Sequence, residues 1–177
     1  MPVVDHLIAR DGVPALSGHA YDYVVAGDGL FLHASNRWLD VRVPVAACEV
    51  RGLEPLGGAC TLVHGKIPYA LWHIMVRLFR QAHRGGCELL MGVRFTECGY
   101  DLVLPEQSVA PLAVEYTTEE DLVLEVHSHR DGAARFSGTD DADEQRLRLY
   151  GVVGKLDDLR PAVNLRAGAY GHFLPIQ

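Results

Sequence analysis

The residues from 127 to 140 hold the side chains most able to do chemistry. His127 and His129 are separated by one residue, and Ser137 and Asp140 follow in the pattern H-x-H, seven residues, S, x-x, D. With nine histidines in the chain, an H-x-H pair alone has a chance expectation of about 0.5, whereas the four-residue pattern has one of roughly 0.001. Coincidence is therefore a poor explanation for the whole pattern.

The pattern suits a metal site if the histidines lie on a strand. Residues 121–129 have the composition of a strand, and alternate side chains of a strand share a face, so the imidazoles of His127 and His129 can converge on one ion. Asp140, at the start of a following helix, can add a carboxylate oxygen. Two histidines and one carboxylate form a three-ligand set, which is typical of catalytic zinc because the fourth position stays open for water or substrate.

Simpler roles exist for the polar residues around this pattern. Ser137-x-x-Asp140 is also a helix-capping arrangement, but capping does not require two histidines at this offset, which favours the metal role for Asp140. Glu125 shares the face of the histidines and could either orient one of them or point elsewhere. Three further acidic residues are expected to be solvated and to stabilise the positive end of the helix dipole: Asp141, Asp143 and Glu144.

The remaining metal-binding residue types are expected to be structural. His73 lies in line with three arginines that would repel a cation. Six other histidines are expected to be exposed or packed: His6, His19, His33, His64, His83 and His172. The cysteines contain no C-x-x-C pair, and we expect buried thiols at all four: Cys48, Cys60, Cys87 and Cys98.

Periodicity and turn residues indicate the elements that position these groups. A helix begins near Pro68, carries apolar residues at helical spacing and ends at Gly85 and Gly86. A second helix is expected over 140–150. Strands are expected over 21–26, 29–34, 38–45, 87–95, 100–104, 121–129, 163–169 and 170–174. This order predicts an α/β or α+β fold, and the glycine-rich stretch 53–65 is the best candidate for a domain boundary.

Composition excludes several classes of protein. The chain has 177 residues, with 16 basic and 23 acidic side chains and a net charge of −7, and it has no basic run, so a nucleic-acid interface is not expected. No stretch approaches the roughly 20 apolar residues of a membrane span, and residues 1–12 do not read as a secretory signal. We therefore expect a cytoplasmic protein that contacts neither nucleic acid nor membrane.

The H-x-H, S, D pattern resembles the JAMM motif of the MPN or JAB superfamily of zinc metallopeptidases, and the resemblance covers about residues 65–177. It implies a mixed sheet flanked by helices, similar to cytidine deaminase, preceded here by a β-rich module over 1–64. It also implies zinc held by three residues: His127, His129 and Asp140. The family's upstream glutamate opens a strand as E-x-x-x-G, which Glu88 matches, with Glu97 the weaker choice. The chain departs from the family at Arg130, where proline is common.

A narrower resemblance joins residues 134–144 and 149–154 to protein A of the PRTRC cassette, a prokaryotic JAB-domain family. The resemblance implies partners from the same cassette: a ubiquitin-like protein, whose C-terminal tail would be the substrate, and a ThiF-like (E1-like) activating protein. Glu88 would then be the general base and Ser137 the oxyanion donor in hydrolysis of a peptide or isopeptide bond. Two alternatives remain, a non-catalytic binding module and a small-molecule amide hydrolase that uses the same zinc site.

Overall fold

The computed structural model describes residues 4–105, 107–110, 113–116, 121–129 and 132–176. Over these residues the chain forms three β-sheets and two helices, so the predicted mixed α/β class is confirmed. The chain divides into two compact units. The first takes in residues up to Gly65 with 144–147 and 167–176, and the second takes in 66–143 and 148–166. The division into domains of residues 1–64 and 65–177, and the likeness to cytidine deaminase, stay predictions.

The first unit is built on a five-stranded sheet in the order β1-β2-β3-β4-β5. Its strands are β1 (Asp5–Ile8), β2 (Asp22–Ala26), β3 (Gly29–Ser35), β4 (Leu39–Ala47) and β5 (Ala59–Leu62). β1 and β2 are parallel, and the other neighbours are antiparallel. The three strands predicted here correspond to β2, β3 and β4.

A small apolar core stabilises this sheet. Along β2 the side chains alternate between buried and partly buried, and Val24 and Ala26 pack with Ala9 and Phe31. The buried Asp22 carboxylate at the start of β2 accepts hydrogen bonds from the backbone N–H and the hydroxyl of Ser17. Both oxygens of this buried charge are therefore hydrogen-bonded, as a buried carboxylate requires.

The larger sheet has the order β13-β12-β11-β10-β6-β7. Its strands are β6 (Leu90–Thr96), β7 (Gly99–Val103), β10 (Leu122–Ser128), β11 (Arg148–Gly154), β12 (Ala162–Ala169) and β13 (His172–Ile176). β12 begins in the second unit and ends in the first, to which β13 belongs. A separate hairpin, β8 (Gln107–Ala110) with β9 (Ala113–Tyr116), was not predicted from the sequence.

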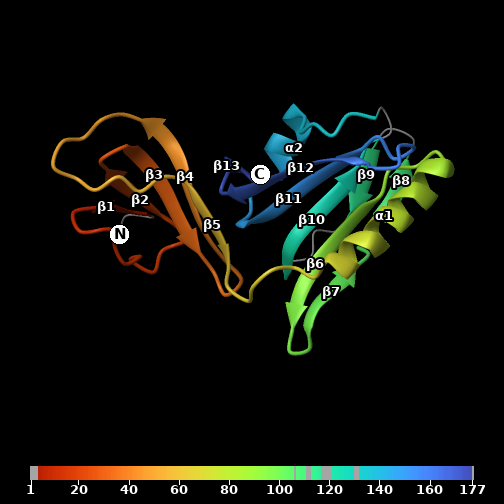
Figure 1. The fold of residues 1–177 in the computed structure, drawn as a ribbon, viewed down its shortest axis with the longest axis horizontal. Coiled ribbons are helices and arrows are strands. Elements are labelled where there is room, and N and C mark those ends of the chain that lie inside the picture. Colours follow the sequence, from red (N-terminus) through yellow and green to blue (C-terminus); the bar gives the residue numbers. More distant parts are fainter. Residues whose placement is uncertain (1–3, 106, 111–112, 117–120, 130–131, 177) are drawn as a thin grey trace. The chain divides into compact units, whose positions relative to one another are not determined.

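Helix α1 (Tyr69–Arg84) covers one face of the larger sheet, alongside β6 and β10 in Figure 1. Its Met75 and Phe79 pack with Val126 of β10 and with residues of β6 and β11. The helix was correctly predicted, including its end at Gly85 and Gly86. The apolar positions expected at helical spacing were Ile67, Leu71, Ile74, Met75, Leu78 and Ala82. The buried face is rotated from them, because Ile74 is 45% exposed while Phe79, which was not among them, is fully buried.

The predicted helix over 140–150 is wrong in length. Helix α2 spans only Gly138–Asp143, and Arg148–Gly154 is strand β11. Every residue of β11 is buried, as in a parallel strand covered on both faces. A short apolar run that is buried all round does not show a period of two, so the sequence pattern did not separate this strand from the preceding helix.

Two further expectations concern the surface of the chain. In the described part of the chain, no helix is long and apolar enough to cross a membrane. The four cysteines are free, but the expectation of burial is wrong for Cys48 and Cys98, which are exposed. Cys60 is partly buried, and burial, with a smaller effect from the Asp40 charge, raises the pKa of its thiol to about 11.

Candidate metal centre

Strand β10 places the two histidines at the middle of the larger sheet. It lies between β6 and β11, and its Val126 packs into the core beneath α1. Because neighbouring side chains of a strand point to opposite faces, His127 lies on the face away from α1. His129 follows just beyond the end of β10, where its backbone N–H donates to the Val153 carbonyl of β11 at 2.9 Å.

The three residues predicted as metal ligands come together in the structure. Nε2 of His127 lies 3.1 Å from Nε2 of His129 and 3.3 Å from Oδ1 of Asp140. Tetrahedral zinc with bonds of 2.0–2.1 Å places its ligand atoms about 3.3 Å apart. The spacing of the ligand atoms therefore fits zinc, and among the described residues no other group of three such side chains lies this close.

The ring of His129 is oriented by the chain that follows it. Its Nδ1 lies 3.2 Å from the carbonyl oxygen of Ala133, to which a protonated Nδ1 donates. That hydrogen bond selects the tautomer in which Nε2 carries a lone pair toward His127 and Asp140, as metal-binding histidines require. Arg130 itself lies outside the described residues.

Ser137 and Asp140 form the capping arrangement that the sequence offered for them. The Ser137 backbone N–H donates to Oδ2 of Asp140 at 2.5 Å, and the Asp140 N–H donates to the Ser137 hydroxyl at 3.3 Å. This reciprocal pair closes the start of α2. It occupies Oδ2 of Asp140, while Oδ1 faces His127. Capping therefore leaves the second oxygen of the Asp140 carboxylate facing the histidines, where it could bind a metal ion.

The protonation of these groups suits a cation. Burial is the main reason that the pKa of His127 falls to about 4, with His129 and Arg166 lowering it further and Asp140 opposing them. Burial raises the pKa of Asp140, but the hydrogen bonds from Ser137 and the nearby histidines outweigh it, so the net shift is downward. At neutral pH the site therefore offers a neutral His127 imidazole and an ionised Asp140 carboxylate.

Glu88 lies two residues before β6, the strand that pairs with β10. His127 is opposite Leu90 in the antiparallel register, and one step further the Ser128 N–H donates to the Leu89 carbonyl at 3.0 Å. Continued one residue further, past the ends of both strands, this register would bring Glu88 opposite His129. Residues that are directly opposite in an antiparallel pair share a face, so the backbone would bring Glu88 to the edge where the histidines lie. Glu97 is at the far, turn end of the β6–β7 hairpin.

Arg166 was not identified from the sequence. This β12 residue is only 7% exposed, donates from Nη1 to Oδ1 of Asp141 at 2.6 Å, and lies 3.7 Å above the ring of Phe136. It therefore holds the chain on both sides of Ser137 and Asp140. Asp141 is exposed in the first turn of α2, as expected, and it also pairs with Arg166. The expectation is wrong for Glu144, which is 4% exposed and therefore buried. The sequence signal that could have identified Arg166 was a single arginine within the largely apolar stretch Ala162–Ala169.

Glu125, for which the sequence left two roles open, forms a buried ion pair. Its Oε2 accepts a 2.7 Å hydrogen bond from Nη1 of Arg148 in β11, and both residues are at most 5% exposed. Glu125 lies two residues before His127, on the same face of β10. Arg148 is a further buried charge that the sequence reasoning missed, because it lay in the stretch expected to be helical.

Comparison with known proteins agrees with the motif. A search of curated proteins finds no match for the chain. The family model described as prokaryotic homologs of the JAB domain matches residues 59–165, which include Glu88, the histidine pair, Ser137 and Asp140. This match covers more than half of the sequence. The chain therefore belongs to the family of prokaryotic homologs of the JAB domain.

Proposed function

We propose that this protein is a zinc-dependent metallopeptidase that hydrolyses a peptide or isopeptide bond. The observation that carries the proposal is the cluster of His127, His129 and Asp140, whose ligand atoms have the spacing of tetrahedral zinc. Its three-ligand set leaves one position for water or substrate. Membership of the JAB family supports the same reading, since that family includes metallopeptidases.

The chain's own residues divide the chemistry between them. A zinc ion bound by the cluster would acidify a water molecule and polarise the scissile carbonyl. Glu88 would act as general base, taking the proton of that water and later giving it to the leaving amine. Ser137 would donate its hydroxyl hydrogen to the oxyanion of the tetrahedral intermediate. Its hydroxyl already accepts from the Asp140 N–H, which leaves its own hydrogen available for that bond.

The proposed substrate is the C-terminal tail of a ubiquitin-like protein, either conjugated to another protein or carrying extra residues. This part of the proposal comes from the resemblance to protein A of the PRTRC cassette, which also suggests a ThiF-like partner and a cytoplasmic location. Extended tails commonly bind by pairing with an exposed strand. A non-catalytic JAB module would hold the same partner without turning it over, and a small-molecule amide hydrolase would leave the tail unchanged.

Intact-protein mass spectrometry tests the proposal directly. The zinc-loaded full chain would be incubated with the ubiquitin-like protein of such a cassette, extended at its C-terminus, beside parallel reactions with Glu88→Gln and with metal-stripped protein. We expect the wild type to shorten the tail by a defined mass and both controls to leave it intact. An unchanged tail after prolonged incubation with the zinc-loaded wild type would contradict the proposed reaction.

A further inference from the structure

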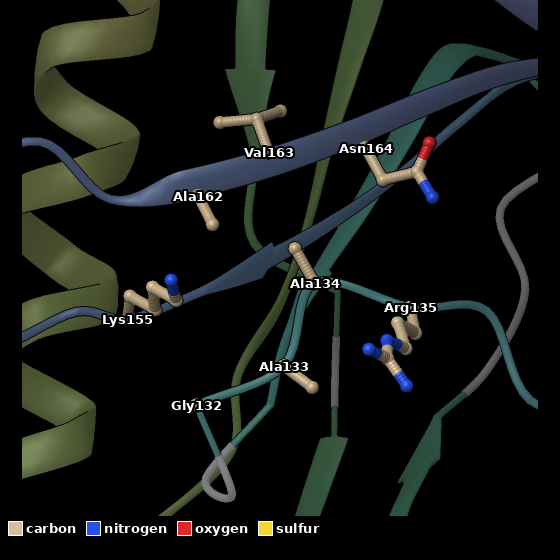
Figure 2. Close-up of a pocket in the computed structure, with 8 residues that line it drawn as sticks. All are labelled: Gly132, Ala133, Ala134, Arg135, Lys155, Ala162, Val163 and Asn164. Atoms are coloured by element: carbon tan, nitrogen blue, oxygen red, sulfur yellow. The ribbon is translucent and has the colours of Figure 1, made fainter.

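A cavity of about 550 Å³ opens beside residues 132–135. This volume is within the range of sites that hold small ligands or a few peptide residues, about 300–1,000 Å³. Figure 2 shows its lining, which comes from that segment, from the residue after β11 and from the start of β12: Gly132, Ala133, Ala134, Arg135, Lys155, Ala162, Val163 and Asn164. No role in the metal centre was assigned to these side chains.

The cavity is directly coupled to the metal centre. The carbonyl of Ala133, one of its lining residues, is the group that orients the His129 ring. The wall formed by 132–134 lies directly on β11, because a Cβ at Gly154 would be 2.7 Å from the backbone of Ala133 and Ala134. A glycine at position 154 therefore allows this close approach.

Two cations make this cavity suited to an anion. Arg135 and Lys155 lie on either side of the small residues Ala133 and Ala134 in Figure 2. Over the described residues, neither side chain forms a hydrogen bond or an ion pair. In a chain of net charge −7, this cavity thus has two exposed cations without an ion pair in the described part of the chain. The Asn164 amide, at the same cavity, adds a hydrogen-bond donor.

We infer that this cavity is a substrate subsite that binds a carboxylate of the polypeptide near its scissile bond. Arginine and lysine form charge-assisted hydrogen bonds to carboxylates, and arginine can do so with two parallel bonds. The small side chains between the two cations leave room for a peptide backbone. A polypeptide supplies carboxylates from two sources, an acidic side chain or a free C-terminus. The identification of the ligand as substrate rests on the proposed function, whereas the preference for a carboxylate rests on the cavity alone.

Peptide binding to the metal-free full chain tests the inference without any requirement for catalysis. The chelator would be dialysed away, since it is itself an anion. Three probes have the same core: acetyl-Gly-Gly-Glu-amide carries a side-chain carboxylate, acetyl-Gly-Gly-Gln a terminal carboxylate, and acetyl-Gly-Gly-Gln-amide neither. Backbone amide shifts of residues 132–135 in a ¹⁵N-labelled protein report the binding. We expect at least one carboxylate probe to bind about tenfold more tightly than the neutral probe. Comparison of the two carboxylate probes shows whether the cavity prefers a side-chain carboxylate or a C-terminal one.

A matched pair of double variants assigns the effect to the cavity. R135Q/K155Q removes the two cations of the cavity, and R77Q/R84Q removes the same charge from exposed positions of α1. The first variant should lose the preference for the carboxylate, and the second should keep it. Equal binding of charged and neutral probes, or an unchanged preference in R135Q/K155Q, would overturn the inference.

The outcome is separable from that of the proposed function. Preferential carboxylate binding in a protein that never shortens the tail would leave the cavity assignment standing and remove the proposed reaction. Tail shortening by a protein that shows no carboxylate preference would support the proposed reaction and overturn the cavity assignment. Repeating the titration after zinc loading shows whether the subsite still binds its carboxylate when the metal centre is filled.

Discussion

Nη1 of Arg166 donates a 2.6 Å hydrogen bond to Oδ1 of Asp141, the residue that directly follows the proposed metal ligand Asp140. The same guanidinium lies over Phe136, which precedes Ser137. One buried arginine of β12 thus contacts the chain immediately before and after the Ser137–Asp140 segment. The geometry of the metal centre therefore depends on a strand that carries none of its ligands.

We expect Arg166→Lys to weaken zinc binding by about 10- to 100-fold, the usual effect of losing a group that orients metal ligands. Lysine keeps the charge but cannot lie flat on Phe136 while also bonding Asp141. Competition with a zinc-binding dye measures the affinity. Arg160→Lys, at an exposed position of the same unit, is the control. An Arg166→Lys protein with wild-type zinc affinity would show that zinc binding does not need the contacts of Arg166 with Asp141 and Phe136.

The second prediction concerns the ligands themselves. Asp140→Asn should lose zinc while keeping the fold, because an asparagine side-chain oxygen can still accept from the Ser137 N–H and cap α2. His127→Ala should also lose zinc. Elemental analysis after reconstitution gives the zinc content, and circular dichroism checks the fold. Stoichiometric zinc in both variants would place the metal elsewhere in the chain.

Replacement of Glu88 separates metal binding from catalysis. Glu88→Gln should retain zinc but lose about 10²- to 10⁴-fold in turnover, the usual contribution of a general base. Glu97→Gln removes the same charge from the far end of the β6–β7 hairpin and should remain fully active. The tail-shortening reaction provides the rate. An active, zinc-loaded Glu88→Gln protein would rule out the base assignment.

Ser137→Ala has two separable effects. Loss of a donor to the oxyanion should lower kcat by about 10²- to 10³-fold with zinc retained. Loss of the hydroxyl that accepts the Asp140 N–H should also lower the free energy of unfolding by about 1 kcal/mol. Ser137→Thr keeps the hydroxyl and is the matched control. Kinetics that match wild type in Ser137→Ala would exclude the oxyanion role.

The last prediction concerns the stability of the first unit. Although burial raises the pKa of Asp22, hydrogen bonds from Ser17 and from the Asp5 N–H lower it more, so it lies below the ordinary 3.8. Asp22→Asn should reduce the free energy of unfolding at pH 7 by about 1–3 kcal/mol, because the Ser17 N–H loses a carboxylate acceptor.

The pH dependence of that difference follows from the direction of the shift. The folded carboxyl binds protons less readily than the unfolded one, so its contribution is complete above pH 3.8 and is lost as the pH falls through the lower, folded pKa. Urea unfolding of wild type and Asp22→Asn, at pH values above and below 3.8, measures the difference in their free energies of unfolding. A stability difference that does not shrink below pH 3.8 would contradict the role of the ionised Asp22 carboxylate.

The sequence by itself identified the three residues that cluster at the candidate site. The histidine pair could be predicted because H-x-H at the end of a strand tends to place two side chains on one face, a local property with a period of two. Ser137 and Asp140 cap α2 through a contact three residues apart, which is also local. Helix α1 was predictable for the same reason, since its apolar period and its terminal glycines lie within one segment.

Only the tertiary structure decided which distant residues support the site. Arg166 meets Asp141 and Phe136 across 25 and 30 residues of sequence, and Arg148 meets Glu125 across 23. These partners depend on the order and register of β10, β11 and β12, which no local period encodes. The first three residues of β11, 148–150, were mistaken for the end of a helix, because a strand that is buried on both faces shows no period of two. Contacts between strands that are distant in sequence, rather than propensity, therefore settled the surroundings of the proposed metal centre.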